Sequence, residues 1–215
     1  MRHHNSLIGD QGLLDPTNDN LDHGVLPYLE TRKRSKDKRT DKEKTLPALA
    51  FVRPYNEMLM LGLLNIDEFG VKTRSRNLNY KGPVLLYTSN GRPHQIPAQA
   101  HGLNLSEVPA GAIVGVATMV DSRELVWEER VKATQNFNNW GRRQAEDNLC
   151  IMNLYGKTQD DCILPLTFGV FMKNIKRFKE PVQFKPKHGA IGIMRVPLGQ
   201  VSKALKEVGI NPKSL

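Results

Sequence analysis

Residues 48–64, ALAFVRPYNEMLMLGLL, decide how the folded part of this chain begins. The apolar run Ala48–Val52 has the length of a short buried strand, and the Arg-Pro pair after it stops the strand. From Tyr55 to Leu64 the apolar side chains follow a helical spacing, which Gly62 weakens near the end. The sequence therefore predicts a strand followed directly by a compact apolar helix.

Further apolar runs, separated by turn residues, predict the rest of the domain. The additional strands are expected at Val84–Tyr87, Ala112–Val120, Phe168–Met172 and Ala190–Val196. The Pro-punctuated residues 175–184 indicate another strand, with a bulge. Residues 199–208 place apolar side chains on one face of a helix that Gly209 ends. Short strands with a few helices predict an α+β domain over residues 46–215.

Residues 122–164 interrupt the strand pattern with a helical insertion. Its middle, residues 126–154, is compatible with helix, and Gly141 together with the Asn-rich residues 136–139 favours two helices over one. The Trp, Met and Leu side chains of residues 127–154 most simply pack into the core. The alternative is a docking surface for a protein partner.

Residues 1–45 predict a disordered, charged N-terminal arm. They contain too few apolar side chains to offset the entropy of ordering, and a basic cluster begins at Arg32. That cluster indicates either an electrostatic arm for phosphates or a nuclear address, with a solvated linker as the plain alternative.

Charge and composition narrow the classes of function. The 215 residues carry a net charge of +9, so polyanions are the default partners. The two isolated cysteines, Cys150 and Cys162, indicate neither a metal site nor a disulfide framework, and no cofactor is expected. No apolar run approaches the ~20 residues needed to cross a bilayer, and no secretory signal is visible. A cytoplasmic location follows, or a nuclear one if the host has a nucleus.

Four segments in order resemble the ASCH branch of the PUA-like superfamily. They are residues 48–55, ALAFVRPY; residues 80–89, YKGPVLLYTS; residues 111–117, GAIVGVA; and residues 168–193, whose FGVF and GAIGI resemble the closing strands. The resemblance covers most of residues 46–198 outside the insertion. It implies a PUA-like β-pseudobarrel with a basic cleft for RNA or a modified nucleoside.

The family signature, G-x-K-x-x-E-x-R, is degenerate in this chain. Counting from Gly62, Leu64 replaces the Lys and Asp67 replaces the Glu, whereas Arg74 matches the Arg when counted back from residues 81–82. A short insertion at residues 68–72 reconciles the two counts, and Lys72 would then lie near the vacant Lys position.

The resemblance implies a hydrolase of modified nucleosides or a ribonuclease as one alternative. In that alternative Lys72 is the base, Ser75 or Thr73 is the nucleophile, and Asp67 or Glu68 is the carboxylate helper. A lysine activates a hydroxyl only if its pKa falls toward neutrality.

Binding of RNA or single-stranded nucleic acid is the favoured function, because it uses the same residues without a complete signature. The candidate contacts are the cations Arg53, Lys72, Arg74, Arg76, Lys81 and Arg92, a second basic group of Lys173, Lys176 and Arg177, and Tyr87 and Ser89 at the pocket floor. Tyr55 and Tyr80 are further stacking candidates. His94 and His101 are expected in a loop, residues 90–104, at the rim.

Overall fold

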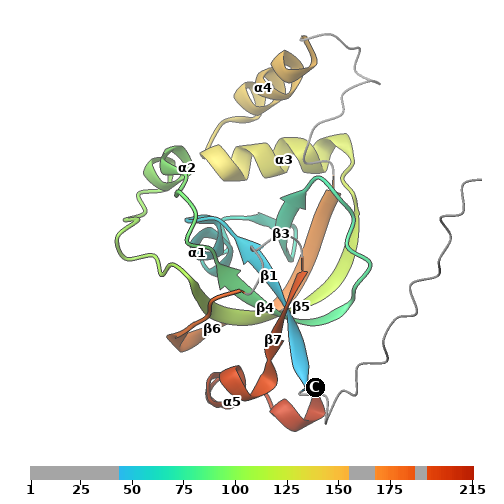
Figure 1. The fold of residues 1–215 in the computed structure, drawn as a ribbon. Coiled ribbons are helices and arrows are strands. Elements are labelled where there is room, and N and C mark those ends of the chain that lie inside the picture. The colour runs from blue at the N-terminus through green and yellow to red at the C-terminus, as the bar shows by residue number, and fades with distance from the viewer. Residues whose placement is uncertain (1–43, 155–167, 187–192) are drawn as a thin grey trace, which may run out of the picture. The chain divides into compact units, whose positions relative to one another are not determined.

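Strand β1 (Thr45–Phe51) lies inside a sheet, where it pairs in parallel with β4 (Gly82–Thr88) and antiparallel with β7 (Ile193–Pro197) (Figure 1). The computed structural model describes residues 44–154, 168–186 and 193–215. Residues 41–215 belong to one compact unit. The arm expected at residues 1–45, except its last two residues, lies outside the described residues, as do Cys162 and His188.

The described strands form one mixed sheet in the order β2-β3-β6-β5-β4-β1-β7. The remaining strands are β2 (Asn65–Ile66), β3 (Phe69–Arg74), β5 (Ala112–Glu124) and β6 (Phe168–Gln183). Every neighbouring pair except β1–β4 is antiparallel. Within the described part of the chain, the edge strands β2 and β7 are not paired with each other. With its helices, this sheet confirms the α+β class.

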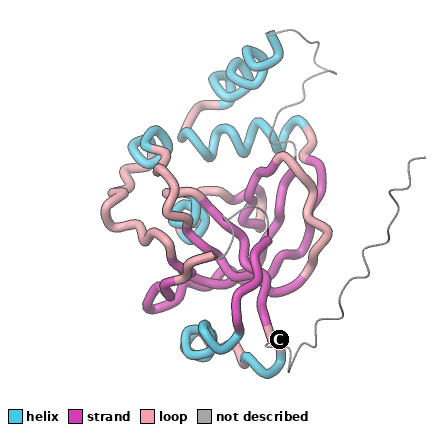
Figure 2. Tube along the Cα trace, viewed as in Figure 1, coloured by secondary structure: helices cyan, strands magenta, loops and turns pink. Residues whose placement is uncertain are grey.

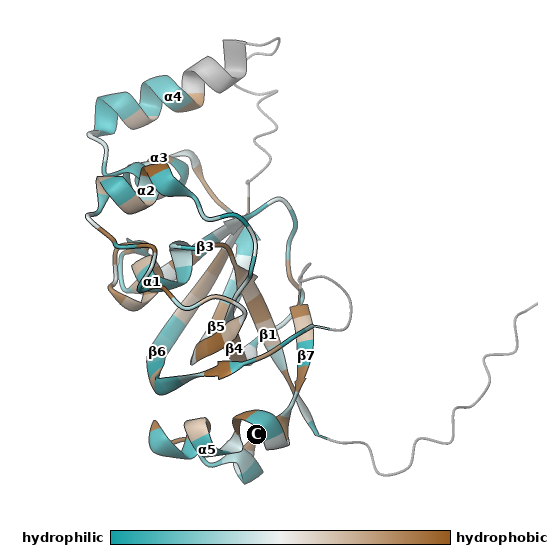
Figure 3. Cartoon of the chain, turned by 60° about the vertical axis from the view of Figure 1, so that its left-hand side comes forward, coloured by the Kyte–Doolittle hydropathy of each residue, from teal (hydrophilic) through white to brown (hydrophobic). Residues whose placement is uncertain are grey.

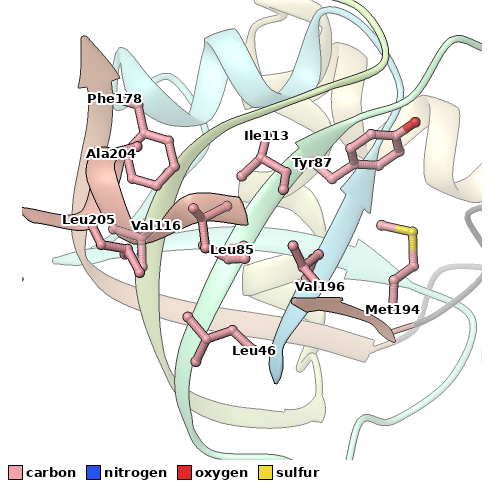
Figure 4. Packing of buried hydrophobic residues seen from close by; sticks show 12 residues of the cluster. Leu46, Leu85, Tyr87, Ile113, Val116, Phe178, Met194, Val196, Ala204 and Leu205 are labelled. Atoms are coloured by element: carbon pink, nitrogen blue, oxygen red, sulfur yellow. The ribbon is translucent and has the colours of Figure 1, made fainter. Parts of the chain in front are cut away.

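Alternation along the central strands divides the core into two clusters. On one face, Leu85 and Tyr87 of β4 pack with β1, β5 and β7 (Figure 4). Val201 and Leu205 of α5 (Leu198–Glu207) cover this face, and both are fully buried. Figure 3 shows the hydrophobic segments concentrated on the strands. The expected C-terminal helix is thus confirmed, and a 3-10 turn, η2 (Pro212–Ser214), follows it.

The other face is covered by α1 (Tyr55–Met60). Met58 and Leu59 of this helix pack against Phe51 and Leu86. The helix is shorter than the expected residues 55–64, because Gly62 takes a φ of 73°, a left-handed conformation that ends helices. The apolar residues beyond it lead into β2 instead.

Strands β2 and β3 form a hairpin that turns at Asp67, whose φ is 52°. Residues 68–72, expected as a short insertion, therefore supply part of the second hairpin strand. This places Lys72 inside β3, where the alternation with Arg74 puts both residues on one face.

The helical insertion contains two helices, as expected: α3 (Trp127–Asn138) and α4 (Arg142–Leu154). Asn139, with a φ of 53°, ends the first. One strand end and one short helix near the insertion differ from the expectation. Strand β5 continues to Glu124, and a short helix, α2 (Gln95–Ala100), occupies the segment expected as a loop (Figure 2). No helix among the described residues is long and apolar enough to cross a membrane.

Strand β6 is one long strand where two were expected. It pairs with β5, and the register shifts three times along that pair, between Ile113 and Gly115, between Val116 and Thr118, and between Met119 and Asp121. Such irregularities bend a strand and increase its twist, so one continuous strand can follow a curved sheet.

Candidate functional site

A cavity of about 380 Å³ is formed by several segments that are distant in the sequence. They are the end of β1, the start of α1, strand β3, the residue after β4, the residue before α2, and the end of α3. Its lining residues are Ala50, Phe51, Val52, Tyr55, Leu64, Lys72, Thr73, Ser89, His94, Phe137 and Asn138. Aromatic and aliphatic side chains form most of the wall, with one ammonium group and a few hydroxyls among them. This composition suits a small, flat ligand with some polar atoms.

Lys72 is the cationic side chain of this cavity. Its Nζ lies 4.2 Å from the centroid of the Phe51 ring. Burial, together with a smaller effect of the positive charge of Arg74, lowers the pKa of Lys72 to about 7. Among the described residues no carboxylate forms an ion pair with Lys72. At neutral pH a large fraction of this side chain is therefore an uncharged amine.

Tyr55, Phe137 and His94 form an aromatic part of the wall of the same cavity. The Tyr55 ring meets Phe137 edge to face, with centroids 5.2 Å apart, and meets His94 in the same way at 5.3 Å. The Tyr55 hydroxyl is hydrogen-bonded to Nδ1 of His94 at 2.7 Å. Burial raises the pKa of Tyr55, so its hydroxyl stays protonated and able to donate.

A second hollow, of about 460 Å³, adjoins the first. The two share Tyr55, His94 and Asn138, and the second extends over the segment that leads into α2. Arg92 lines it, and so does Ile96, which is 69% exposed. Together the hollows offer an apolar chamber next to a more open, cationic one.

Hydrogen bonds between segments hold the walls in place. The amide of Ser89 donates to the Phe51 carbonyl at 2.8 Å, and the amide of His94 donates to the Arg53 carbonyl at 2.9 Å. Asn139 donates from Nδ2 to the Ala100 carbonyl, which ties α3 to α2. The ring of His101 also bonds to α3, through the Asn136 carbonyl. His101 therefore serves the scaffold of the rim, whereas His94 lines both hollows.

Four of the predicted cations lie on or near the segments that form the two hollows. Arg92 lines the second hollow, and Arg74 lies half-buried on β3, where burial lowers its pKa. Arg53 is half-buried between β1 and α1, and its Nε has no hydrogen-bond partner among the described residues. Arg76 is exposed beyond the end of β3.

The other predicted cations bind protein atoms elsewhere. Lys81 pairs with Asp121 at 3.1 Å, and Lys173 pairs with Glu68 at 2.6 Å. Arg177 makes two hydrogen bonds to Glu57, at 2.7 and 2.9 Å. In the same region Lys176 donates to a backbone carbonyl, that of Val208. None of these four lines either hollow.

The two residues expected at the pocket floor are separated. Ser89 lines the cavity, but Tyr87 is 2% exposed in the opposite core cluster, where its ring meets Phe184 edge to face. Side chains two positions apart in a strand point to the same face. Tyr87 and Ser89 would therefore share a face only if β4 continued through Ser89. Strand β4 ends at Thr88, and the chain turns there.

The residues named for hydrolysis are not all brought together. Asp67 and Ser75 are exposed at the two ends of β3 and do not line the cavity, nor does Glu68. Thr73 does line it, next to Lys72. Among the described lining residues there is no carboxylate.

Phe51, Phe137 and Asn138 line the cavity and were not expected there. Phe51 was expected inside the first buried strand, and Phe137 lies in the segment expected as a helical insertion. No spacing in the sequence connects these two residues, because they come from distant segments and line one cavity only in the folded chain.

One part of the insertion packs within itself, whereas Ala133 and Phe137 of α3 pack against the sheet. Trp127 contacts a small cluster made by Val131, Ala145 and Leu149 of the two helices. Beside it, Val126 is 61% exposed. Docking of a protein partner through residues 127–154 stays a prediction.

No protein-family model matches this chain, and no curated protein is similar to it. Among the described residues, no group of three His, Cys, Asp or Glu side chains is arranged to hold a metal ion.

Proposed function

We propose that this domain binds single-stranded nucleic acid, RNA or DNA, by accepting one unstacked base in the cavity beside Lys72. The observation that supports this most is the aromatic wall of Tyr55 and Phe137, which lines the same cavity of about 380 Å³ as the Lys72 amine. Small-ligand pockets have volumes of about 300–1,000 Å³. Aromatic rings that stack an exposed base are the usual means of single-strand recognition.

The second hollow would bind the sugar-phosphate backbone next to the bound base. Arg92 lies exposed at its wall, and the second hollow shares Tyr55 and His94 with the first. A phosphate next to the bound base would therefore meet a guanidinium, which binds phosphate with two parallel hydrogen bonds. The net charge of +9 adds a long-range attraction for polyanions.

In this proposal the fold is an ASCH-like variant of the PUA-like pseudobarrel. Three of the four segments that resemble the family lie on β1, β4 and β5, around the single parallel pair of the sheet. The curvature of the sheet also favours a pseudobarrel. Strands β3 and β1 are four positions apart, about 19 Å in a flat sheet, yet Lys72 reaches Phe51.

Titration of labelled RNA and DNA single strands with the full chain, at several salt concentrations, tests the proposal. The variants are Tyr55→Leu for stacking, Arg92→Gln for the phosphate, and Lys179→Gln as a matched loss of one exposed charge on β6. We expect Tyr55→Leu to weaken binding by about 5-fold or more, since stacking contributes about 1–3 kcal/mol per base. Arg92→Gln should lower the salt slope by about 1.

A fourth variant separates the cavity from the N-terminal arm. In it the basic cluster at residues 32–34 is replaced by three glutamines within the full chain. If this variant loses binding while Tyr55→Leu retains it, the arm carries the affinity and the cavity proposal is wrong.

Hydrolysis of a modified nucleoside is the second candidate, favoured by one observation: the lowered pKa of Lys72 in a cavity that the Thr73 and Ser89 side chains also line. The amine would then serve as a base. Loss of product formation in both Lys72→Met and Thr73→Val, with oligonucleotide binding retained, would favour this candidate. No product from acylated nucleosides would exclude it.

A further inference from the structure

The amine of Lys72 has the surroundings of a covalent nucleophile. It lies in a cavity large enough for a ring-sized ligand, and the residue keeps partial access to solvent. Among the described lining residues no carboxylate holds the ammonium form. An uncharged amine attacks carbonyl carbon, whereas an ammonium group has no free electron pair.

We propose that Lys72 forms an imine with an aldehyde-bearing ligand whose planar ring enters the aromatic cavity. The electron pair of Nζ forms a bond to the carbonyl carbon, and one amine proton passes to the carbonyl oxygen, which gives a carbinolamine. That oxygen then leaves as water with the second amine proton, and a C=N double bond remains. No electron is gained or lost, and water reverses the reaction.

The wall supplies what this reaction requires besides the amine. The hydroxyls of Tyr55 and Ser89 are protonated groups that can pass a proton to or from the carbonyl oxygen. The rings of Phe51 and Phe137 favour a flat ligand. Arg92 in the adjoining hollow favours a ligand that also carries an anionic group.

The charged and titratable groups around Nζ are few. Arg74 on β3 lowers the pKa of Lys72, while Tyr55 from α1 and His94 before α2 are the other titratable side chains among the described lining residues. The lining residues of β1 and α3 carry no titratable side chain. The pH dependence of the reaction should therefore follow the deprotonation of Lys72 itself.

Pyridoxal 5′-phosphate is a suitable probe, because it joins a planar ring, an aldehyde and a phosphate. The full chain is incubated with it at pH 6 to 10, the imine is reduced with borohydride, and modified lysines are mapped by peptide mass spectrometry. At pH 7 we expect Lys72 to be labelled at least about 10-fold faster than Lys179, which is exposed and lies in neither hollow. Labelling of Lys72 should reach half its maximum near pH 7.

The same chain unfolded in urea is the control, since it contains identical lysines without the cavity. Selectivity for Lys72 should disappear there. Labelling spread evenly over exposed lysines in the folded chain, or selectivity that survives unfolding, would overturn the proposal. Because mapping uses the unaltered protein, it needs no variant that folds, and it does not depend on whether oligonucleotides bind.

Discussion

The ammonium nitrogen of Lys72 lies over the ring of Phe51, 4.2 Å from its centroid, although the two residues come from strands four positions apart in the sheet. Two effects compete at this contact. The ring favours the charged form by about 0.5–2 kcal/mol. Burial disfavours it, by up to about 3–5 pKa units for a fully buried lysine. The pKa falls to about 7, so burial is the larger effect.

The first prediction concerns stability and pH. Lys72 has a folded-state pKa of about 7, below its ordinary value, so the folded protein releases a proton that the unfolded chain still holds. Below pH 7 both states are charged and the folded state bears the cost of burial. As pH rises above 7 that cost disappears, so the stability contributed by this residue increases. Between pH 7 and 9 the gain should be about 2 kcal/mol.

Urea unfolding of the wild type and Lys72→Met across that range measures this gain. The difference between the two free energies of unfolding isolates Lys72, because the other groups titrate alike in both chains. A difference that stays constant from pH 7 to 9 would mean that Lys72 titrates as an exposed lysine does, and the cavity would then be open to water.

The second prediction tests the buried hydrogen bond that joins α1 to β4. Asn56 donates from Nδ2 to the Thr88 hydroxyl at 2.9 Å, and both residues are buried. Thr88→Val keeps the shape and removes the acceptor, which should cost about 1–3 kcal/mol because the amide is left unsatisfied. Thr88→Ser keeps the hydroxyl and should cost less, about 1 kcal/mol for the lost methyl group. If the Thr88→Val variant proves more stable than the Thr88→Ser variant in urea unfolding, this hydrogen bond contributes little to the stability of the fold.

Much of the fold was predictable because it depends on local patterns. Apolar runs bounded by Gly and Pro located the strands, and the Asn-rich break before Gly141 correctly separated α3 from α4. The end of α1 was wrong by four residues, since the left-handed Gly62 outweighs the apolar pattern that continues to Leu64. The extent of β5 was also missed, because its polar end, residues 121–124, pairs with β6 without being buried in the core.

The candidate site was predictable only where one strand determines it. Lys72 and Arg74 were expected among the same group of cations, and alternation along β3 places them on one face. The partners of Lys72 depend instead on strand order and curvature, which no local pattern contains. Phe51 therefore looked like an ordinary core residue, and the bend after β4 separated Tyr87 from the cavity.

The third prediction tests a close approach between β5 and β6. A Cβ on Gly115 would clash with the backbone carbonyl oxygen of Lys176. Backbone cannot yield as a side-chain end can, so Gly115→Ala should lower the free energy of unfolding by about 1–3 kcal/mol. Gly199, in α5, has open space around its Cα. Gly199→Ala is the matched control, with an expected change between zero and about 1 kcal/mol of added stability.

A stable Gly115→Ala would contradict the register of this strand pair. Thermal and urea unfolding of the two alanine variants, measured together, give the comparison. An equal loss in both would point to a general sensitivity to substitution and not to the contact with Lys176.

The fourth prediction separates cations that bind protein from cations available to a ligand. Arg177 holds Glu57 with two hydrogen bonds, and this pair joins β6 to α1 away from both hollows. Arg177→Gln should therefore cost up to about 1 kcal/mol of stability, as exposed ion pairs do. Its effect on oligonucleotide affinity should stay within about 2-fold, beyond the uniform loss of one charge.

Arg92→Gln is the variant to compare with Arg177→Gln, because it also removes one guanidinium charge, but from the wall of the second hollow. Measured side by side at two salt concentrations, Arg92→Gln should weaken binding more than Arg177→Gln, and Glu57→Gln should change binding only by the uniform effect of one lost negative charge. Tighter binding in Glu57→Gln would show that the freed guanidinium of Arg177 meets the phosphate backbone. The nucleic acid would then lie across β6 and α1, and the path through the second hollow would be wrong.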